Sequence, residues 1–215
     1  MSTKFLIING VFLSLFRSPI AEAHPVAFAG SYSIMTWNSK DMSDWMFTHS
    51  FTANWSLSAR YSRVGTKEGE RTFYLPQVNY LLKRWNELDS QANIYLSAGH
   101  GGEKINSSYE NITALAMEAD WESRKYYVSF KEEVLMAHKN SDKNIYQTKL
   151  RAGFAPYQAQ FDEINSWFIL QADKSSKSEA EFKLTPFIRF FYRNVLTEFG
   201  VSSKGDAQFN FMVHF

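Results

Sequence analysis

The sequence predicts an all-β fold, a transmembrane antiparallel up-and-down β-barrel of about twelve strands, with ten strands as the alternative. Three observations support this prediction. Short segments with an apolar residue at every second position recur from Phe28 to the C-terminus. The breaks between these segments alternate between long polar stretches and short turns. The last segment keeps an apolar face up to the final residue, Phe215.

The clearest alternating segment covers residues 55–62, where the apolar face runs from Trp55 to Tyr61 and serines and an arginine occupy the other positions. Residues 126–136 and 145–154 show the same period of two. Successive side chains of a strand point to opposite faces, so each segment has one apolar and one polar face. A helical period fits none of them. In a barrel, the apolar face meets lipid and the polar face lines the lumen.

Repeating this reasoning along the chain gives twelve predicted strands. Their ranges are 28–37, 44–52, 55–64, 73–84, 91–99, 112–120, 125–137, 145–157, 164–173, 181–192, 195–201 and 207–215. Long polar loops are predicted at residues 65–71 and 100–106, and a short turn at residues 52–54. This alternation is typical of barrels with long outer loops and short periplasmic turns. Pro76 and Pro186 each remove a donor, so each is expected at a bulge or beyond the paired region.

The N-terminal residues have the pattern of a secretory signal peptide. Lys4 supplies the positive start, residues 5–16 form a short apolar core, and Ala21-Glu22-Ala23 is a small-x-small cleavage site. The core is too short for a spanning helix, which needs roughly 20 residues. The predicted organisation is therefore a signal peptide over residues 1–23 and a barrel over residues 24–215, with His24 first in the processed chain.

The C-terminal tail carries a second signal. Phe209, Phe211, Val213 and Phe215 alternate with polar residues or Met212. This tail resembles the C-terminal signal of bacterial outer-membrane β-barrel proteins, which ends in Phe with apolar residues two, four and six places earlier. The resemblance implies recognition by the barrel-assembly machinery, passage through the periplasm and residence in the outer membrane in contact with its lipid.

Composition narrows the class further. Removal of residues 1–23 from the 215 leaves 192, the size of one domain. There is no cysteine, so no disulfide framework is possible. A formal charge of +1 argues against nucleic-acid binding, which needs a clustered basic surface. Aromatic residues make up 17%, as two aromatic girdles would require. No cofactor is indicated, and the sequence sets no oligomeric state.

Enzyme chemistry finds little support in the sequence. His49 and Ser50 are adjacent, but neighbouring strand residues face opposite sides, so they cannot act as a base and a nucleophile together. The chain has no His-x-Ser tripeptide of the kind used by outer-membrane phospholipases. Glu118 and Asp120 share a face and are the candidate pair for a protease, but a lumen ion pair of Glu118 with Lys131 or Arg151 is the favoured interpretation. We therefore predict a non-enzyme.

His24 is the candidate metal ligand. A free amine and an imidazole on one residue can chelate copper, provided that a second histidine approaches. Met35, Met42 and Met46 lie in the first predicted hairpin and could add thioether ligands. The favoured alternative is that His24 is simply the residue after the cleavage site.

The polar faces of the predicted strands give the residues expected in the lumen. They are Arg60, Gln77, Lys83, Glu118, Asp120, Lys131, Glu133, Lys149, Arg151, Arg189 and Glu198. Both charge signs are present, so strong anion or cation selectivity is not expected. Bulky residues such as Tyr95, Tyr127 and Phe187 are also predicted inward, which implies a narrow passage.

We therefore predict a small passive channel or porin-like envelope protein. Three alternatives stay open: a barrel enzyme that hydrolyses lipid or peptide, a copper-handling outer-membrane protein, and a secreted soluble β-barrel binder.

Overall fold

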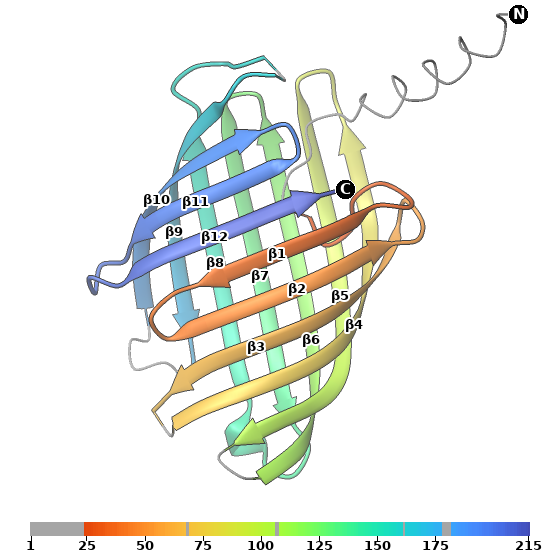
Figure 1. Cartoon of the computed structure of the whole chain (residues 1–215), viewed down its shortest axis with the longest axis vertical. Coiled ribbons are helices and arrows are strands. Elements are labelled where there is room, and N and C mark those ends of the chain that lie inside the picture. Colours follow the sequence, from red (N-terminus) through yellow and green to blue (C-terminus); the bar gives the residue numbers. More distant parts are fainter. Residues whose placement is uncertain (1–23, 68, 106–107, 161, 178–181) are drawn as a thin grey trace, which may run out of the picture.

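The computed structural model describes residues 24–67, 69–105, 108–160, 162–177 and 182–215. In these residues the chain forms twelve antiparallel strands that close into a barrel (Figure 1). The strands are β1 (Tyr32–Asn38), β2 (Met42–Ser50), β3 (Trp55–Thr66), β4 (Gly69–Asn86), β5 (Ser90–Ile105), β6 (Ser108–Ser123), β7 (Tyr126–Ala137), β8 (Ile145–Phe154), β9 (Asn165–Ser175), β10 (Phe182–Tyr192), β11 (Val195–Val201) and β12 (Ala207–His214). The predicted fold class is confirmed, with twelve strands rather than ten.

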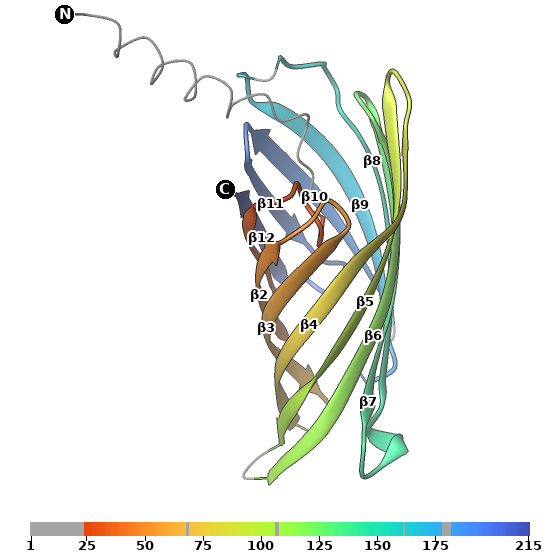
Figure 2. The same cartoon turned by 90° about the vertical axis from the view of Figure 1, so that its right-hand side faces the viewer.

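Each strand pairs with its neighbours in the sequence, and β1 pairs with β12 to close the sheet. At the closure, Tyr32 and Phe215 exchange both backbone hydrogen bonds, at 3.1 and 2.8 Å. We call the end that holds His24 and the β4–β5 and β8–β9 connections the terminal rim, and the opposite end the distal rim. Seen from the side, the barrel is flattened, and the two chain ends of the described residues lie toward the same rim (Figure 2).

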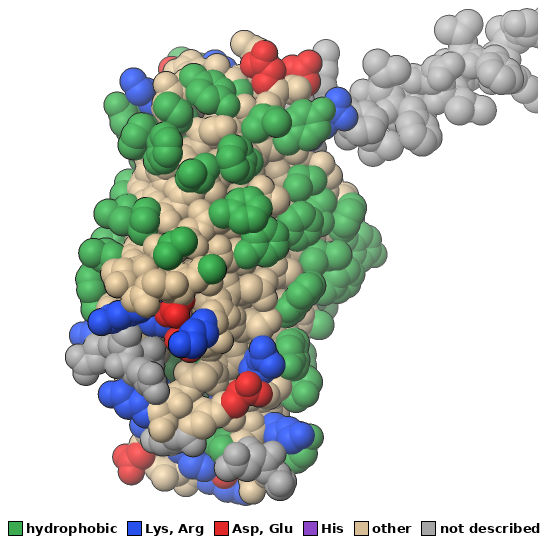
Figure 3. Space-filling model, turned by 60° about the vertical axis from the view of Figure 1, so that its left-hand side comes forward, with side chains coloured by type: hydrophobic (Ala, Val, Ile, Leu, Met, Phe, Trp, Pro, Cys, Tyr) green, Lys and Arg blue, Asp and Glu red, His purple; other side chains and the backbone are tan. Residues whose placement is uncertain are grey.

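The outer wall is apolar. Leu57, Leu150 and Leu170 are each about half exposed, although they lie in the middle of hydrogen-bonded strands. Figure 3 shows hydrophobic side chains across the upper and middle wall, and most charged side chains near the lower, distal end. Exposed aromatic residues lie on both sides of this apolar wall: Trp55, Trp85, Trp121, Tyr126 and Tyr192 toward the terminal rim, and Trp45, Tyr61, Tyr74 and Tyr146 toward the distal rim. Two such girdles around an apolar band are typical of barrels in lipid.

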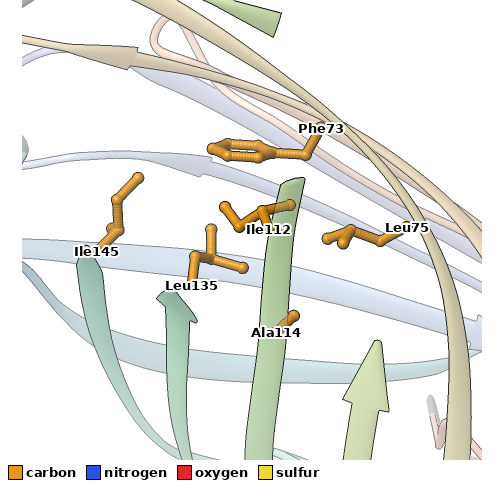
Figure 4. Close-up of a cluster of buried hydrophobic side chains, with 6 residues drawn as sticks. All are labelled: Phe73, Leu75, Ile112, Ala114, Leu135 and Ile145. Atoms are coloured by element: carbon orange, nitrogen blue, oxygen red, sulfur yellow. The ribbon is translucent and has the colours of Figure 1, made fainter. Parts of the chain in front are cut away.

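The interior is filled in part by apolar side chains. The largest cluster joins Phe73 and Leu75 of β4 to residues of β6, β7 and β8, so it packs one wall against another (Figure 4). Its members are Phe73, Leu75, Ile112, Ala114, Leu135 and Ile145. A second cluster contains Tyr127, Ala155, Trp167, Ile169 and Phe187. These clusters fill parts of the flattened barrel with dry packing and leave the remaining space to polar residues.

Two predicted loops are corrected. Residues 65–71 and 100–106 belong mostly to strands, because the β3–β4 ladder continues to the pair of Thr66 with Gly69 and the β5–β6 ladder to the pair of Ile105 with Ser108. The long strands β4, β5 and β6 thus extend the wall at the distal rim. The β8–β9 connection, by contrast, is a long break at the terminal rim, where short turns were expected.

The two prolines behave differently. Pro186 pairs with Leu170 on one side and lies just beyond the β10–β11 pairs on the other, as predicted. Pro76 does not lie at a register shift; the β4–β5 register is the same on either side of it, and the pairs at Leu75 and Pro76 are missing. The predicted signal peptide lies outside the described residues. Among the described residues, no helix is long and apolar enough to cross a membrane.

Candidate functional site: a charged lumen

A cavity of about 180 Å³ lies inside the barrel and is lined by residues from nearly every strand. Eleven of its lining residues are charged and come from opposite walls of the barrel. They are Asp41, Asp44, Arg60, Glu118, Lys131, Glu133, Lys149, Arg151, Asp173, Lys174 and Lys183. The polar faces of the strands thus meet around one chamber, as the period of two requires.

Arg60 joins two walls of this chamber. Its Nε and Nη2 donate to Asp44 of the adjacent strand β2, at 3.0 and 2.7 Å. Its guanidinium also donates to both carboxylate oxygens of Glu133, which lies on β7, four strands away in the barrel order. All three side chains are less than 10% exposed. Arg60 therefore crosses the lumen and narrows it.

Glu198 of β11 forms a second network. Arg151 Nη2 donates to both of its oxygens, at 2.7 and 2.8 Å. Arg189 Nε and Asn210 Nδ2 also donate to it, each at 2.7 Å. Since β8 and β11 are separated by two strands, Arg151 holds parts of the wall together across the interior.

The remaining predicted lumen residues have near neighbours of opposite charge or polar character. Lys131 Nζ lies 3.7 Å from Glu118, the pair that the sequence favoured over a catalytic carboxylate. Lys149 is the register partner of Asp173. Gln77 donates to Asn79 at 2.5 Å. The chamber thus carries charges of both signs.

Lys83 is a correction. It was predicted in the lumen, but the structure exposes it on the outer side, with Nζ 5.8 Å from the Trp85 ring. The β4–β5 register shifts between Leu81 and Lys83, and this irregularity reverses the faces that follow. Arg84 takes the inner side instead and donates to Asn93 at 2.7 Å.

Sequence reasoning also missed a buried pair at the distal rim. Arg71 and Glu103, placed in predicted loops, form an ion pair on the inner wall, where they are 2% and 0% exposed. Arg71 also donates to the carbonyl of Lys143 at 2.7 Å, which fastens the β7–β8 connection. Arg71 shares one strand face with Phe73 and Leu75, and this period of two was the signal that would have placed Arg71 inward.

The first described residues enter the barrel at the terminal rim. Val26 is fully buried against Leu81 and Tyr95. His24 stacks on Tyr95 at 5.2 Å, and its Nδ1 lies 3.4 Å from Asp120. Ser56 donates to the carbonyl of Pro25 at 2.6 Å, and Ala27 donates to Ser50 Oγ at 3.1 Å. We call residues 24–27 the inturned segment. This segment occupies part of the lumen, which the alternating pattern of the strands did not predict.

The structure does not bring a second histidine into contact with His24. His49 stacks on Tyr32 at 4.3 Å, and His214 bonds to Ser33 at 2.5 Å. His100 and His138 share a hydrogen bond partner, Thr113 Oγ1, at 3.1 and 2.8 Å. Across the described residues, no group of three or more histidines and carboxylates is arranged to hold a metal ion. Copper binding at His24 therefore stays a prediction, and the structure supplies no second histidine ligand for it.

The candidate catalytic base His49 and nucleophile Ser50 lie on opposite faces of their strand, as predicted. Ser50 is buried and accepts from Ala27, whereas His49 lies on the opposite face. Asp120, the other candidate acid, accepts a hydrogen bond from Asn93 at 2.7 Å and contacts the inturned segment. None of these contacts joins a nucleophile to a base.

No protein-family model and no curated protein matches the chain. Among solved structures, it is similar to a KdgM porin in complex with disordered oligogalacturonate, with 12% identity, a TM-score of 0.49, and coverage of 86% of this chain and 98% of that one. Another KdgM porin structure gives 12% identity and a TM-score of 0.47 over the same shares. The trimer form of OmpT, an outer membrane protein of Vibrio cholerae, gives 8% identity and a TM-score of 0.39, again over 86% and 98%. The fold assignment rests on the strand pairing of the chain itself.

Proposed function

We propose that this protein resides in the bacterial outer membrane, in contact with its lipid, and acts there as a small passive channel. One observation carries the proposal: a closed sheet has an apolar outer wall and charged side chains around an internal cavity of about 180 Å³. A soluble barrel requires the opposite arrangement, because apolar surface stabilises a fold only when it leaves water.

The contacts across the lumen support a narrow passage. Arg60 reaches Glu133 on another wall, and Arg151 reaches Glu198, so both networks cross part of the interior. The inturned segment occupies part of the terminal rim. Water, ions and small solutes fit such a space better than large solutes do. Because both acidic and basic groups line the chamber, we expect weak charge selectivity.

A non-enzymatic role is part of the proposal. Catalysis of hydrolysis needs a nucleophile or an activated water within hydrogen-bond reach of a base. Ser33 and His214 do share a hydrogen bond, at 2.5 Å, but both are buried at the barrel closure and neither lines the chamber. The charged groups of the chamber are paired with one another, as in Arg60 with Asp44 and Glu118 with Lys131. These pairs position side chains and narrow the passage.

Single-channel recording tests the proposal. The processed protein, refolded in detergent and added to a planar bilayer, should give discrete small current steps, with a reversal potential near zero in a salt gradient. Detergent alone is the control. An absence of current steps at every voltage, with the protein shown to be inserted and folded, would contradict the channel and leave the barrel fold intact.

A further inference from the structure

Three methionines lie side by side on the inner wall at the closure of the barrel. Met35 of β1 is the register partner of both Met46 of β2 and Met212 of β12. Leu196 of β11 is the partner of Met212 and continues the row. The three methionines are 6% exposed or less and pack in one cluster. Three thioether groups from three adjacent strands are thus gathered at one height of the lumen.

Packing alone does not require this choice of residue. Leu196 occupies the same row and fills its place with a hydrocarbon side chain. Methionine in a core commonly fills irregular gaps, because its thioether is flexible and polarisable. The chain has seven methionines, and three of them meet here. Met117 and Met136, by contrast, lie on the outer face of the wall.

Two of the three methionines border space that an ion can enter. A small cavity of about 30 Å³ is lined by Met35, Met46 and Trp37, and also by the oppositely charged Glu118 and Lys131. Met46 also lines the larger chamber. Gln77 points its side-chain amide at Met46 Sδ, 4.0 Å away. A cavity of this size holds about one water molecule, and therefore one small desolvated cation.

We propose that Met35, Met46 and Met212 form a binding site for a soft monovalent cation, the class that contains Cu(I) and Ag(I). Thioether ligands select soft metals, whereas hard cations such as K⁺ and Mg²⁺ require oxygen ligands. Trp37 packs on the cluster, and its ring lies 6.0 Å from Lys131 Nζ, whose charge is offset by Glu118 at 3.7 Å. An aromatic face of this kind favours a desolvated positive charge. The site rests on the proposed function in one respect, because the ion must reach it through the lumen.

The test is calorimetric titration of the refolded, full processed chain with Ag⁺, in non-ionic detergent and a nitrate buffer free of chloride. Every protein carries His100→Asn and His138→Asn, so that this exposed imidazole pair does not add nitrogen ligands. We expect one equivalent of Ag⁺ to bind. Each of Met35→Leu, Met46→Leu and Met212→Leu should weaken binding by at least about tenfold. The triple variant should lose the equivalent, and K⁺ should not compete.

The matched control is the double variant Met117→Leu/Met136→Leu, which removes two thioethers from the outer wall and should bind Ag⁺ as tightly as the parent. Leucine has nearly the volume of methionine, so all variants are expected to fold. Folding of each barrel can be checked by its heat-modifiable mobility in gel electrophoresis. X-ray absorption at the silver edge should show sulfur neighbours.

Equal binding by the parent and the triple variant would overturn the site, as would absence of binding to a folded parent or a silver spectrum with nitrogen and oxygen neighbours alone. Bilayer recordings on the same preparations separate this proposal from the channel. Conduction without Ag⁺ binding refutes the site and supports the channel. Ag⁺ binding lost in the triple variant, without conduction, refutes the channel and supports the site.

Discussion

At the scale of single residues, the face of the strand decides what a charge does. Arg60 and Arg63 are three positions apart on β3 and so lie on opposite faces. The Arg60 side chain is 9% exposed and bonds two carboxylates inside the barrel. The Arg63 side chain is 52% exposed and lies 3.6 Å from Glu70, which is 60% exposed. Solvent weakens the second pair, whereas the first is held in a confined, partly dry interior.

Replacing Arg60 tests this contrast. Arg60→Met leaves Asp44 and Glu133 buried without their cation, which should lower the free energy of unfolding by about 3–5 kcal/mol. It also removes the link across the lumen, so single-channel conductance should rise. Denaturant unfolding and bilayer recording measure the two effects.

Arg63→Met is the matched control and should change the free energy of unfolding by less than about 1 kcal/mol. If Arg60→Met does not fold, Arg60→Met with Asp44→Asn and Glu133→Gln removes all three charges and keeps the conductance test. Unchanged conductance in a folded variant would contradict the role of Arg60 as a constriction.

At the scale of elements, close strand contacts explain where a side chain is excluded. Beside the break in pairing at Pro76, a Cβ on Gly101 would lie 2.0 Å from the Tyr74 carbonyl oxygen. A Cβ on Gly102, one residue further, would meet nothing within 4 Å. The β4–β5 contact therefore requires glycine at one position and tolerates a side chain at the next.

Gly101→Ala should therefore destabilise the barrel by about 1–3 kcal/mol, since backbone must move to admit the methyl group. Gly102→Ala should leave the free energy of unfolding within about 0.5 kcal/mol of the parent. Denaturant unfolding of both proteins in the same detergent is the measurement. Equal free energies of unfolding for the two variants would show that β4 and β5 can move apart at Gly101 without loss of stability.

The inturned segment makes a prediction of its own. Val26→Asp places a carboxylate among Leu81 and Tyr95, where burial of an unpaired charge is costly, so the segment should leave the lumen. Conductance should then increase. Phe28→Asp is the control, because Phe28 is 47% exposed and should tolerate the charge. A folded Val26→Asp barrel with the parent conductance would show that the segment does not obstruct the passage.

At the scale of the whole molecule, the two ends of the chain complete the barrel. β12 pairs with β1, and the backbone of Phe215 extends this pairing by two hydrogen bonds with Tyr32. Its side chain is 60% exposed, so the ring adds little to packing within the folded protein. Contacts within the folded protein therefore do not require a phenylalanine at this position, which is compatible with the proposed recognition of the tail by the barrel-assembly machinery.

Phe215→Ser should reduce the amount of barrel in the outer membrane of producing cells, while the refolded protein keeps its thermal stability. Phe199→Ser is the matched control, since Phe199 is an outward ring of β11 that is 53% exposed and lies outside the tail. Immunoblotting of membrane fractions and melting of the refolded proteins measure the two quantities. Equal membrane levels of the two variants would contradict a special role for the last residue.

Much of the fold was predictable because strand pattern is local. The period of two in residues 55–62 placed Trp55, Leu57 and Tyr61 outside and Arg60 inside, and the structure agrees. Each such segment carries its own evidence, so twelve of them predict twelve strands. The lumen positions that follow a regular strand, such as Glu133 and Arg151, lie on the polar face for the same reason.

Features that depend on distant segments were not predictable. A register shift beyond Leu81 moved Lys83 outward, and no local signal marks that irregularity. The contact of Arg60 with Glu133, the meeting of Met35 with Met46 and Met212, and the entry of residues 24–27 into the lumen join parts far apart in the chain. The sequence by itself determined which face of each strand is apolar, because side chains alternate along any strand. Only the closed tertiary structure decided which inward side chains meet, because closure, register and flattening set the distances across the interior.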